Sequence, residues 1–307
     1  MKGSVYKSTG SWYEVKAENG VFYQCRLRGK FKNSELKVSN PIAVGDRVTL
    51  HFEGEEKGKA VITEIHDRDN YIIRQSTRKT AHVHILASNL DQAVLIATLS
   101  FPRTSTGFID RFLVSAEAYQ IPAVLVFNKK DLMDEEALEK CKALIALYEQ
   151  LGYTCALISA KTKEGLNIFK EILKHKTSLV SGHSGVGKST LLNALLPHVN
   201  QATSDVSAFA NKGTHTTTFA EMFEGDNESL IIDTPGIKEL GLVEMAPEEI
   251  SHYFPEMRKH LGKCQFHNCL HLNEPKCAVK AALKSGLIHE SRYKNYCSML
   301  ENIDNHR

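Results

Sequence analysis

The chain has 307 residues, of which 42% are hydrophobic and 24% are charged, and its formal net charge is +2. These values are ordinary for a globular protein of two or three domains, and the charge is too small to indicate a nucleic-acid partner by itself. The first residues lack the apolar core of a signal peptide, and apolar runs such as 93–99 are too short to span a bilayer. Seven cysteines, most of them scattered, argue against a disulfide framework. We therefore expect a cytoplasmic protein without a membrane partner.

Residues 1–74 are predicted to form a small all-β barrel of the OB type. Short segments of alternating polarity are separated by turns such as Asn19-Gly20, which is the pattern of a barrel or sandwich of short strands. The predicted strands are 12–15, 21–27, 47–52 and 58–65.

Charge is unevenly distributed in this first region. Residues 1–40 contain eight Lys and Arg against three Glu, interleaved with aromatic residues. A basic, aromatic barrel face is typical of nucleic-acid binding, but the same aromatics could fill the core of a solvated barrel. The polar stretch 74–80 indicates either a linker or an arm that contacts phosphates. The sequence decides neither between a nucleic-acid-binding and a solvated barrel nor between a linker and an arm.

From 75 to 245 the sequence alternates between apolar strands and amphipathic helices, which predicts a parallel sheet covered on both faces. Ligands of such sheets bind beyond the carboxyl ends of the strands, and each motif described next follows a predicted strand. The predicted strands are 93–97, 123–127, 154–158, 178–180 and 230–232, and the predicted helices are 109–119, 135–151, 166–173 and 190–196.

Residues 182–189 read G-H-S-G-V-G-K-S and match the P-loop pattern G-x-x-x-x-G-K-[ST] between a strand and a helix. The glycines allow backbone N–H groups to surround phosphate oxygens at the positive end of the helix. Lys188 would reach the β- and γ-phosphates, and Ser189 would ligate Mg²⁺. The predicted nucleotide contacts here are Gly182, His183, Ser184, Gly185, Val186, Gly187, Lys188, Ser189 and Thr190.

Residues 128–131 match N-K-x-D, the guanine-reading motif of GTPases. The Asp131 carboxylate would accept hydrogen bonds from guanine N1–H and the 2-amino group, a pair that adenine lacks. Asn128 would brace the loop and Lys129 would pack along the base.

Two further loops complete the set. Ser159, Ala160 and Lys161 form the companion loop whose backbone contacts the guanine carbonyl. Asp233 would hold Mg²⁺ through water, and the Gly236 amide would sense the γ-phosphate. Four such loops at strand ends predict a GTPase domain.

The order of these motifs is unusual, because the guanine-reading loop precedes the P-loop, whereas in ordinary GTPases it follows. We therefore predict a circularly permuted GTPase domain, a rearrangement that an open α/β sheet tolerates when its termini lie close together.

A cysteine cluster follows in the last region, 246–307. The pattern C-x4-C-x-H-x5-C offers three thiolates and one imidazole, which is a donor set of closed tetrahedral Zn²⁺ sites. The predicted ligands are Cys264, Cys269, His271 and Cys277, with His267 as a rival to His271. Helices predicted at 247–261 and 279–299 make this a small zinc-binding helical domain with one Zn²⁺ per chain.

Together these features resemble the small-ribosomal-subunit-dependent GTPases of the RsgA (YjeQ) family, over nearly the whole chain. Two positions depart from the family pattern: Thr214 replaces Arg in the usual G-R-H-T-T-T segment, and Lys276 replaces the Gly common before the last zinc ligand. The resemblance implies a late-acting assembly factor that binds the 30S subunit and its 16S rRNA near the decoding region. GTP hydrolysis to GDP, with Mg²⁺, would accompany release. We expect a monomer.

Catalysis needs a group that orients the attacking water. Many GTPases use a Gln directly after D-x-x-G, but Ile237 occupies that position and cannot hydrogen-bond to water. His215 is the candidate, and the family resemblance points to the same residue. Thr217 is the expected Mg²⁺ ligand of this segment, with Thr216 as the alternative. A second class of function, an RNA-binding scaffold whose nucleotide only sets its conformation, stays open because the Gln is absent.

Overall fold

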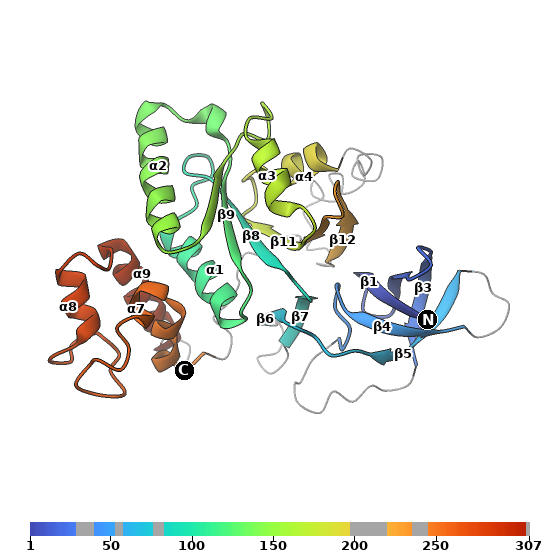
Figure 1. Ribbon diagram of the computed structural model, residues 1–307, viewed down its shortest axis with the longest axis horizontal. Coiled ribbons are helices and arrows are strands. Elements are labelled where there is room, and N and C mark those ends of the chain that lie inside the picture. The colour runs from blue at the N-terminus through green and yellow to red at the C-terminus, as the bar shows by residue number, and fades with distance from the viewer. Residues whose placement is uncertain (29–39, 53–57, 76–82, 197–219, 235–244, 305–307) are drawn as a thin grey trace.

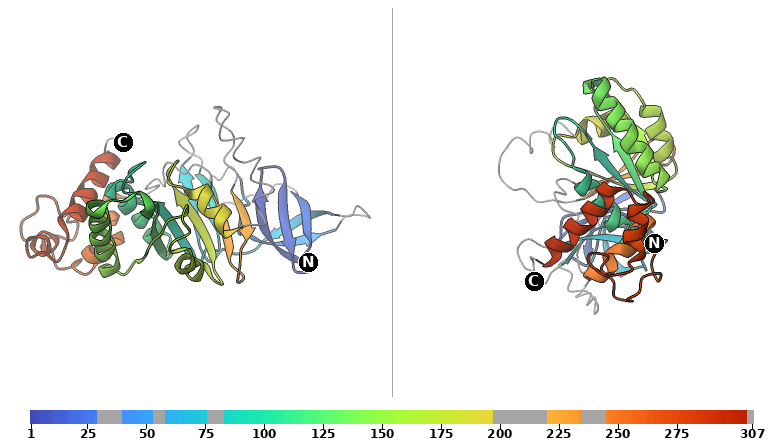
Figure 2. Two further views of the ribbon diagram at one scale, coloured as in Figure 1. Left: turned by 90° about the horizontal axis from the view of Figure 1, so that it is seen from above. Right: turned by 90° about the vertical axis from the view of Figure 1, so that its left-hand side faces the viewer.

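The computed structural model describes residues 1–28, 40–52, 58–75, 83–196, 220–234 and 245–304. The chain forms three parts that lie in a row, with a β-barrel at one end, a sheet with helices in the middle and a group of helices at the other end (Figures 1 and 2).

Five described strands close the N-terminal barrel, which confirms the expected OB-type fold. The strands pair in the order β1-β2-β3-β5-β4, and β4 pairs again with β1, so the sheet has no free edge. Alternate side chains such as Val5, Val15 and Ile62 point inward and are fully buried. The strands are β1 (Lys2–Ser8), β2 (Tyr13–Ala17), β3 (Phe22–Leu27), β4 (Arg47–His51) and β5 (Lys59–Ile65).

The aromatic residues of the barrel divide between its core and its surface. Tyr13 is 2% exposed and belongs to the core, whereas Phe22 is 42% exposed. The guanidinium of Arg26 lies 3.9 Å from the centre of the Trp12 ring. Part of the aromatic set is therefore available at the surface beside basic groups.

The central part is an α/β sheet, as expected. Five strands run parallel in the order β10-β9-β8-β11-β13, and the antiparallel strand β12 lies beside β13. The strands are β8 (Gln92–Ala97), β9 (Ala123–Phe127), β10 (Thr154–Leu157), β11 (Thr177–Gly182), β12 (Glu221–Glu224) and β13 (Leu230–Asp233).

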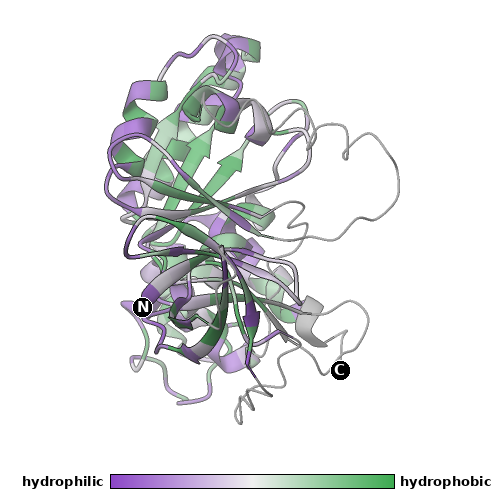
Figure 3. Ribbon diagram, turned by 90° about the vertical axis from the view of Figure 1, so that its right-hand side faces the viewer, coloured by the Kyte–Doolittle hydropathy of each residue, from purple (hydrophilic) through white to green (hydrophobic). Residues whose placement is uncertain are grey.

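Helices cover both faces of this sheet. Side chains of α1 and α2 share one apolar cluster with the strands, and those of α3 and α4 share another on the opposite face. Figure 3 shows the central strands as predominantly hydrophobic, whereas the surrounding helices also present hydrophilic residues. The helices are α1 (Thr106–Ala118), α2 (Glu135–Gln150), α3 (Leu166–Leu173) and α4 (Lys188–Leu195), with a short 3₁₀ turn η1 (Lys130–Leu132).

Strand β12 joins the central sheet to the barrel, a connection that the sequence analysis missed. Lys7 of β1 pairs with Glu221 of β12 in the backbone register, and their side chains form an ion pair at 3.1 Å. The Tyr6 hydroxyl also donates a hydrogen bond to Glu224 at 2.7 Å. Because β12 is short and polar at both ends, no apolar pattern marks it in the sequence.

Residues 74 and 75, the described part of the stretch expected to be a linker or a phosphate-contacting arm, lie in a strand. Strands β6 (Tyr71–Gln75) and β7 (Val83–Ser88) form a two-stranded antiparallel sheet, while residues 76–82 lie outside the described part of the chain. Ile72 and Ala87 are fully buried in the core of the central part. Apolar side chains on both strands therefore attach this hairpin to the central part.

The C-terminal part is helical, and the two helices predicted there are each interrupted. Phe254 is extended because a residue before proline disfavours the helical conformation, so the predicted helix 247–261 breaks at Pro255. Gly286, with a φ of +74°, ends the first half of the other predicted helix. The elements are α6 (Pro247–Ile250), η2 (Ser251–Tyr253), α7 (Pro255–Arg258), α8 (Ala278–Lys284) and α9 (Glu290–Asp304).

Within the described ranges, no helix has the length and apolarity needed to cross a membrane.

Candidate nucleotide and metal sites

The P-loop connects the end of β11 to the start of α4. A Cβ atom on Gly182 would lie 2.7 Å from the Ile96 carbonyl oxygen. A Cβ atom on Gly187 would lie 2.5 Å from the side-chain amide nitrogen of Asn128. Gly187 also has a φ of +90°, a conformation that other residues rarely adopt. Gly182 is therefore required by the close approach of strand β8, and Gly187 by that of the guanine-reading loop.

Two residues predicted to serve the phosphates and Mg²⁺ lie in direct contact. The Lys188 ammonium donates to Asp233 Oδ1 at 2.6 Å and to the Thr234 carbonyl at 3.2 Å. The parallel pairing of β11 with β13 brings the two loops together. Ser189, the predicted Mg²⁺ ligand on the same loop, is exposed.

Asn128 links three of the predicted loops. Its side chain is 1% exposed. The amide nitrogen donates to the Val186 carbonyl of the P-loop at 2.8 Å, and the amide oxygen accepts from the Ala160 N–H at 2.9 Å. The predicted bracing role of this residue therefore has a geometric basis.

Asp131, the predicted guanine-reading residue, is exposed and oriented by Ser159. The Ser159 hydroxyl donates to Asp131 Oδ1 at 2.5 Å and itself accepts from the Thr162 N–H at 3.1 Å. A cavity of about 270 Å³ opens beside the carboxylate. Its lining residues come from three loops: Asn128, Lys129, Asp131, Leu132, Ala160, Lys161, Gly187 and Thr190.

The loop between β8 and α1 contacts both the guanine-reading loop and the P-loop, and the sequence analysis missed it. The Lys129 ammonium donates to the Phe101 carbonyl at 2.5 Å, and Pro102 packs against Gly185. The ring of Phe108, in the first turn of α1, lies 3.7 Å from the ring of His183, measured between centroids. No nucleotide-binding motif marks this loop, so only its aromatic and proline residues could have drawn attention to it.

The predicted catalytic residue His215 and the predicted ligands Thr217 and Gly236 lie outside the described residues. Their roles stay predictions.

The four predicted metal ligands converge. Ligand atoms of Cys264, Cys269, His271 and Cys277 all lie within 4.8 Å of one another. The Nδ1 atom of His271 faces the group, 3.4 Å from the sulfur of Cys277, whereas the rival His267 is exposed and outside it. Three thiols and one imidazole fit a tetrahedral zinc site.

Backbone and side-chain groups hold this cluster in place. The N–H of Ala278 donates to the Cys264 sulfur at 3.3 Å. Glu274 accepts from the N–H groups of Leu270 and Leu272 at 2.7 and 2.8 Å, which shapes the loop that carries His271. Burial, together with the neighbouring thiols, raises the pKa of Cys269 to about 12. A metal would therefore have to displace the thiol proton.

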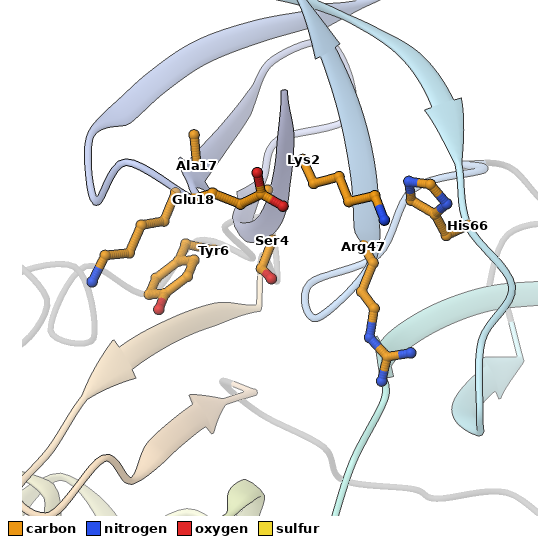
Figure 4. Close-up of a pocket in the computed structure, with 9 residues that line it drawn as sticks. Lys2, Ser4, Tyr6, Ala17, Glu18, Arg47 and His66 are labelled. Carbon is orange, nitrogen blue, oxygen red and sulfur yellow. The ribbon is translucent and has the colours of Figure 1, made fainter.

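A larger cavity, of about 540 Å³, lies on the barrel, away from the nucleotide loops. Figure 4 shows Lys2, Arg47 and His66 on one side of it and Tyr6 on the other. Its lining contains more basic than acidic side chains.

The fold and the nucleotide loops together define the class of protein to which this chain belongs. A P-loop, a guanine-reading loop and an aspartate loop meet at the carboxyl ends of one parallel sheet, with β8, β9 and β10 preceding the P-loop strand in the chain. This is the architecture of a circularly permuted GTPase.

Comparison with known sequences identifies the family. The model of the RsgA GTPase matches residues 65–243, and that of the RsgA N-terminal domain matches residues 2–62. The chain therefore belongs to the RsgA family and is a GTP hydrolase.

Similar proteins cover the full length of the chain. The small ribosomal subunit biogenesis GTPase RsgA of Cytophaga hutchinsonii is 53% identical over 100% of both chains. Its namesake in Bacteroides fragilis is 52% identical over 98% of this chain and 96% of the relative. The crystal structure of YjeQ from Thermotoga maritima is 38% identical, with a TM-score of 0.79 over 100% and 99% of the two chains. YloQ, described as a circularly permuted GTPase, is 31% identical, with a TM-score of 0.75 over 100% and 96%.

Proposed function

We propose that this GTP hydrolase acts as a late-stage assembly factor of the small ribosomal subunit, in the cytoplasm and as a monomer. It would bind the 30S subunit and its 16S rRNA, hydrolyse GTP faster when bound and leave as hydrolysis proceeds. The observation that carries the proposal is that relatives matching the whole chain, such as that of Cytophaga hutchinsonii, carry the name of small ribosomal subunit biogenesis GTPase.

In the nucleotide site, Asp131 would read the guanine edge from the position in which Ser159 holds it. Lys188 would exchange the Asp233 carboxylate for phosphate oxygens, since a polyphosphate offers the ammonium more negative charge than one carboxylate. The same exchange would release the Asp233 carboxylate from its ion pair with Lys188. Gly187 supports this assignment, because the backbone of a loop without a side chain at this position can approach the phosphates.

Mg²⁺, bound with GTP, would neutralise charge that develops on the phosphates during transfer. Ser189, Thr217 and Asp233 are the proposed residues around it. His215 is the proposed group that orients the attacking water, and Gly236 is the proposed γ-phosphate sensor. These assignments rest on the motifs and on the family resemblance.

For the metal cluster we propose one structural Zn²⁺ per chain, held by Cys264, Cys269, His271 and Cys277. All four positions are taken by protein ligands, which is typical of structural rather than catalytic zinc sites. The ion would supply the cross-link between the loop of His271 and the start of α8, where Cys277 caps the helix.

For RNA contact we propose the barrel. The basic cavity with Lys2, Arg47 and His66 would receive backbone phosphates, and the exposed ring of Phe22 would offer a stacking surface. Binding of the small subunit should then weaken as the salt concentration rises. We propose three domains, over residues 1–74, 75–245 and 246–307. The first boundary falls within the hairpin β6–β7.

Turnover of GTP measured with and without purified small subunits tests the proposed function. We expect slow hydrolysis by the protein alone and strong stimulation by 30S subunits, but not by 50S subunits. A scaffold whose nucleotide only sets its conformation would bind 30S subunits without any change in turnover. That result would overturn the proposed stimulation by the small subunit and favour the scaffold.

A further inference from the structure

We propose that helix α1 positions the P-loop relative to the C-terminal metal-binding part, so that contacts made by α9 set the rate at which nucleotide leaves. The positioning residues are Phe108, Asp110 and Asn295. The inference rests on the nucleotide role of the P-loop, but it does not depend on the ribosomal partner.

The first contact of α1 is with the P-loop. The Phe108 ring packs on His183, with 3.7 Å between the ring centroids and 36° between the ring planes. The position of Phe108 is itself fixed, because its N–H donates to the Ser105 hydroxyl that caps the helix, at 3.2 Å. His183 directly follows Gly182, so displacement of the Phe108 ring would alter the start of the phosphate-binding loop.

The second contact of α1 is with α9, through a buried carboxylate. Asp110 is fully buried, and its Oδ1 accepts from Arg292 at 2.5 Å and from the Tyr148 hydroxyl at 2.7 Å. Its Oδ2 accepts from the side-chain amide of Asn295 at 2.6 Å. Arg292 also donates to Glu256 at 2.7 Å. Burial disfavours the charge of Arg292, but the two carboxylates more than offset it and raise its pKa above the usual value.

These two contacts use different sides of α1. At 3.6 residues per turn, side chains two residues apart point roughly 200° apart around the helix axis. Phe108 and Asp110 therefore face nearly opposite directions, and α1 lies between the P-loop and α9. The helices also approach closely, since a Cβ atom on Gly107 would lie 3.4 Å from the Asn295 side-chain oxygen.

Helix α9 in turn holds the loop that carries the metal ligands. The Tyr293 hydroxyl donates to the His271 carbonyl at 2.6 Å, and the Tyr296 hydroxyl donates to the Leu270 carbonyl at 2.8 Å. A series of direct contacts thus leads from the metal loop through α9 and α1 to the P-loop.

The buried charges restrict how α9 can pack against α1. A buried ion pair adds little net stability, but it is costly to break, so α9 can dock on α1 only where Arg292 meets Asp110 and Glu256. Movement of α9 would either break the network or carry α1 with it. In the second case the packing of Phe108 on His183 would change.

A double-mutant cycle on the full-length, metal-replete protein tests the proposal. The measured quantity is the dissociation rate of a fluorescent GDP analogue, without ribosomal subunits. We expect Asn295→Ala and Phe108→Leu each to raise this rate by about 2- to 30-fold. In the Phe108→Leu background, Asn295→Ala should have little further effect, because the route to the P-loop is already interrupted. Lys294→Ala, on the exposed side of α9, is the matched control and should leave the rate unchanged.

Tyr293→Phe is the second probe, because it removes only the hydroxyl that contacts the His271 carbonyl and keeps the ring. It should raise the dissociation rate in the wild-type background but not with Phe108→Leu. If the rate in Asn295→Ala or Tyr293→Phe equals that of the wild type, the proposal is wrong. The proposal would also be overturned if Asn295→Ala or Tyr293→Phe raised the dissociation rate by the same factor in the Phe108→Leu background as in the wild type. Such independent effects would show that Asn295 and Tyr293 have a merely structural role. Neither result would bear on stimulation by small subunits.

Discussion

The side-chain amide of Asn128 donates a hydrogen bond to the Val186 carbonyl at 2.8 Å, which attaches the guanine-reading loop to the P-loop. Its oxygen accepts from the Ala160 N–H at 2.9 Å, so the companion loop is attached as well. The side chain is buried, and both partners are backbone groups. One buried side chain therefore holds three loops of the nucleotide site together.

Asn128→Ala should weaken binding of GTP and GDP alike, by at least about tenfold. The substitution leaves two buried backbone groups without partners, and each costs about 1–3 kcal/mol. Titration calorimetry measures the affinities. Lys130→Ala on the same loop, which removes only an exposed ion pair with Glu164, is the control. Equal affinities in Asn128→Ala and the wild type would contradict the bracing role.

Asp131→Asn should change base preference from guanine to xanthine. A carboxamide offers a donor to the 2-oxo group of xanthine, whereas it loses the paired acceptors that guanine requires. Ser159→Ala should reduce GTP affinity less, by about 1 kcal/mol, because it removes only the hydroxyl that orients the carboxylate. Competition of GTP and XTP for the purified variants measures both effects. Retention of full GTP affinity by Asp131→Asn, without any gain for XTP, would refute the assignment.

Metal-replete protein should contain about one Zn²⁺ per chain. Elemental analysis should find the metal lost from His271→Ala and Cys277→Ser but retained in His267→Ala, the exposed neighbour that lies outside the cluster. Absence of zinc from the wild type would show that the cluster is not a zinc site. Loss of zinc from His267→Ala would instead point to a different ligand set.

Lys276→Gly should stabilise the metal-binding part. Lys276 has a φ of +52°, a left-handed conformation that disfavours side chains by about 1 kcal/mol and that glycine adopts freely. Lys259→Gly is the matched control and should destabilise, because Lys259 has an ordinary φ of −64°. Thermal unfolding of the zinc-bound proteins measures the difference. If the thermal unfolding midpoint of Lys276→Gly is lower than that of the wild type, the left-handed conformation of Lys276 does not destabilise the protein.

His215→Ala should abolish most of the turnover stimulated by small subunits while preserving GTP affinity and 30S binding. Ile237 offers no hydrogen bond to water, so we expect no other side chain next to the aspartate loop to take over. His175→Ala, at an exposed site beside Glu228, serves as the control. Full stimulation of His215→Ala would mean that the catalytic group lies elsewhere.

The sequence by itself determined the class of the protein and the places where its chemistry lies. The P-loop, the guanine-reading loop and the cysteine cluster are short and contiguous, and each residue type is required by local chemistry. Their order along the chain also revealed the permutation. The break at Pro255, which the predicted helix 247–261 missed, could also have been predicted from the sequence, because the restriction that proline places on the preceding residue is local.

Only the tertiary structure decided which distant residues meet. Arg292 and Asp110 are 182 positions apart, and neither has a neighbour in sequence that indicates the pairing. The packing of Phe108 on His183 and the union of β12 with β1 likewise depend on how whole elements dock. Such contacts arise from burial and shape, which act between surfaces that the chain brings together only after its helices and strands have formed.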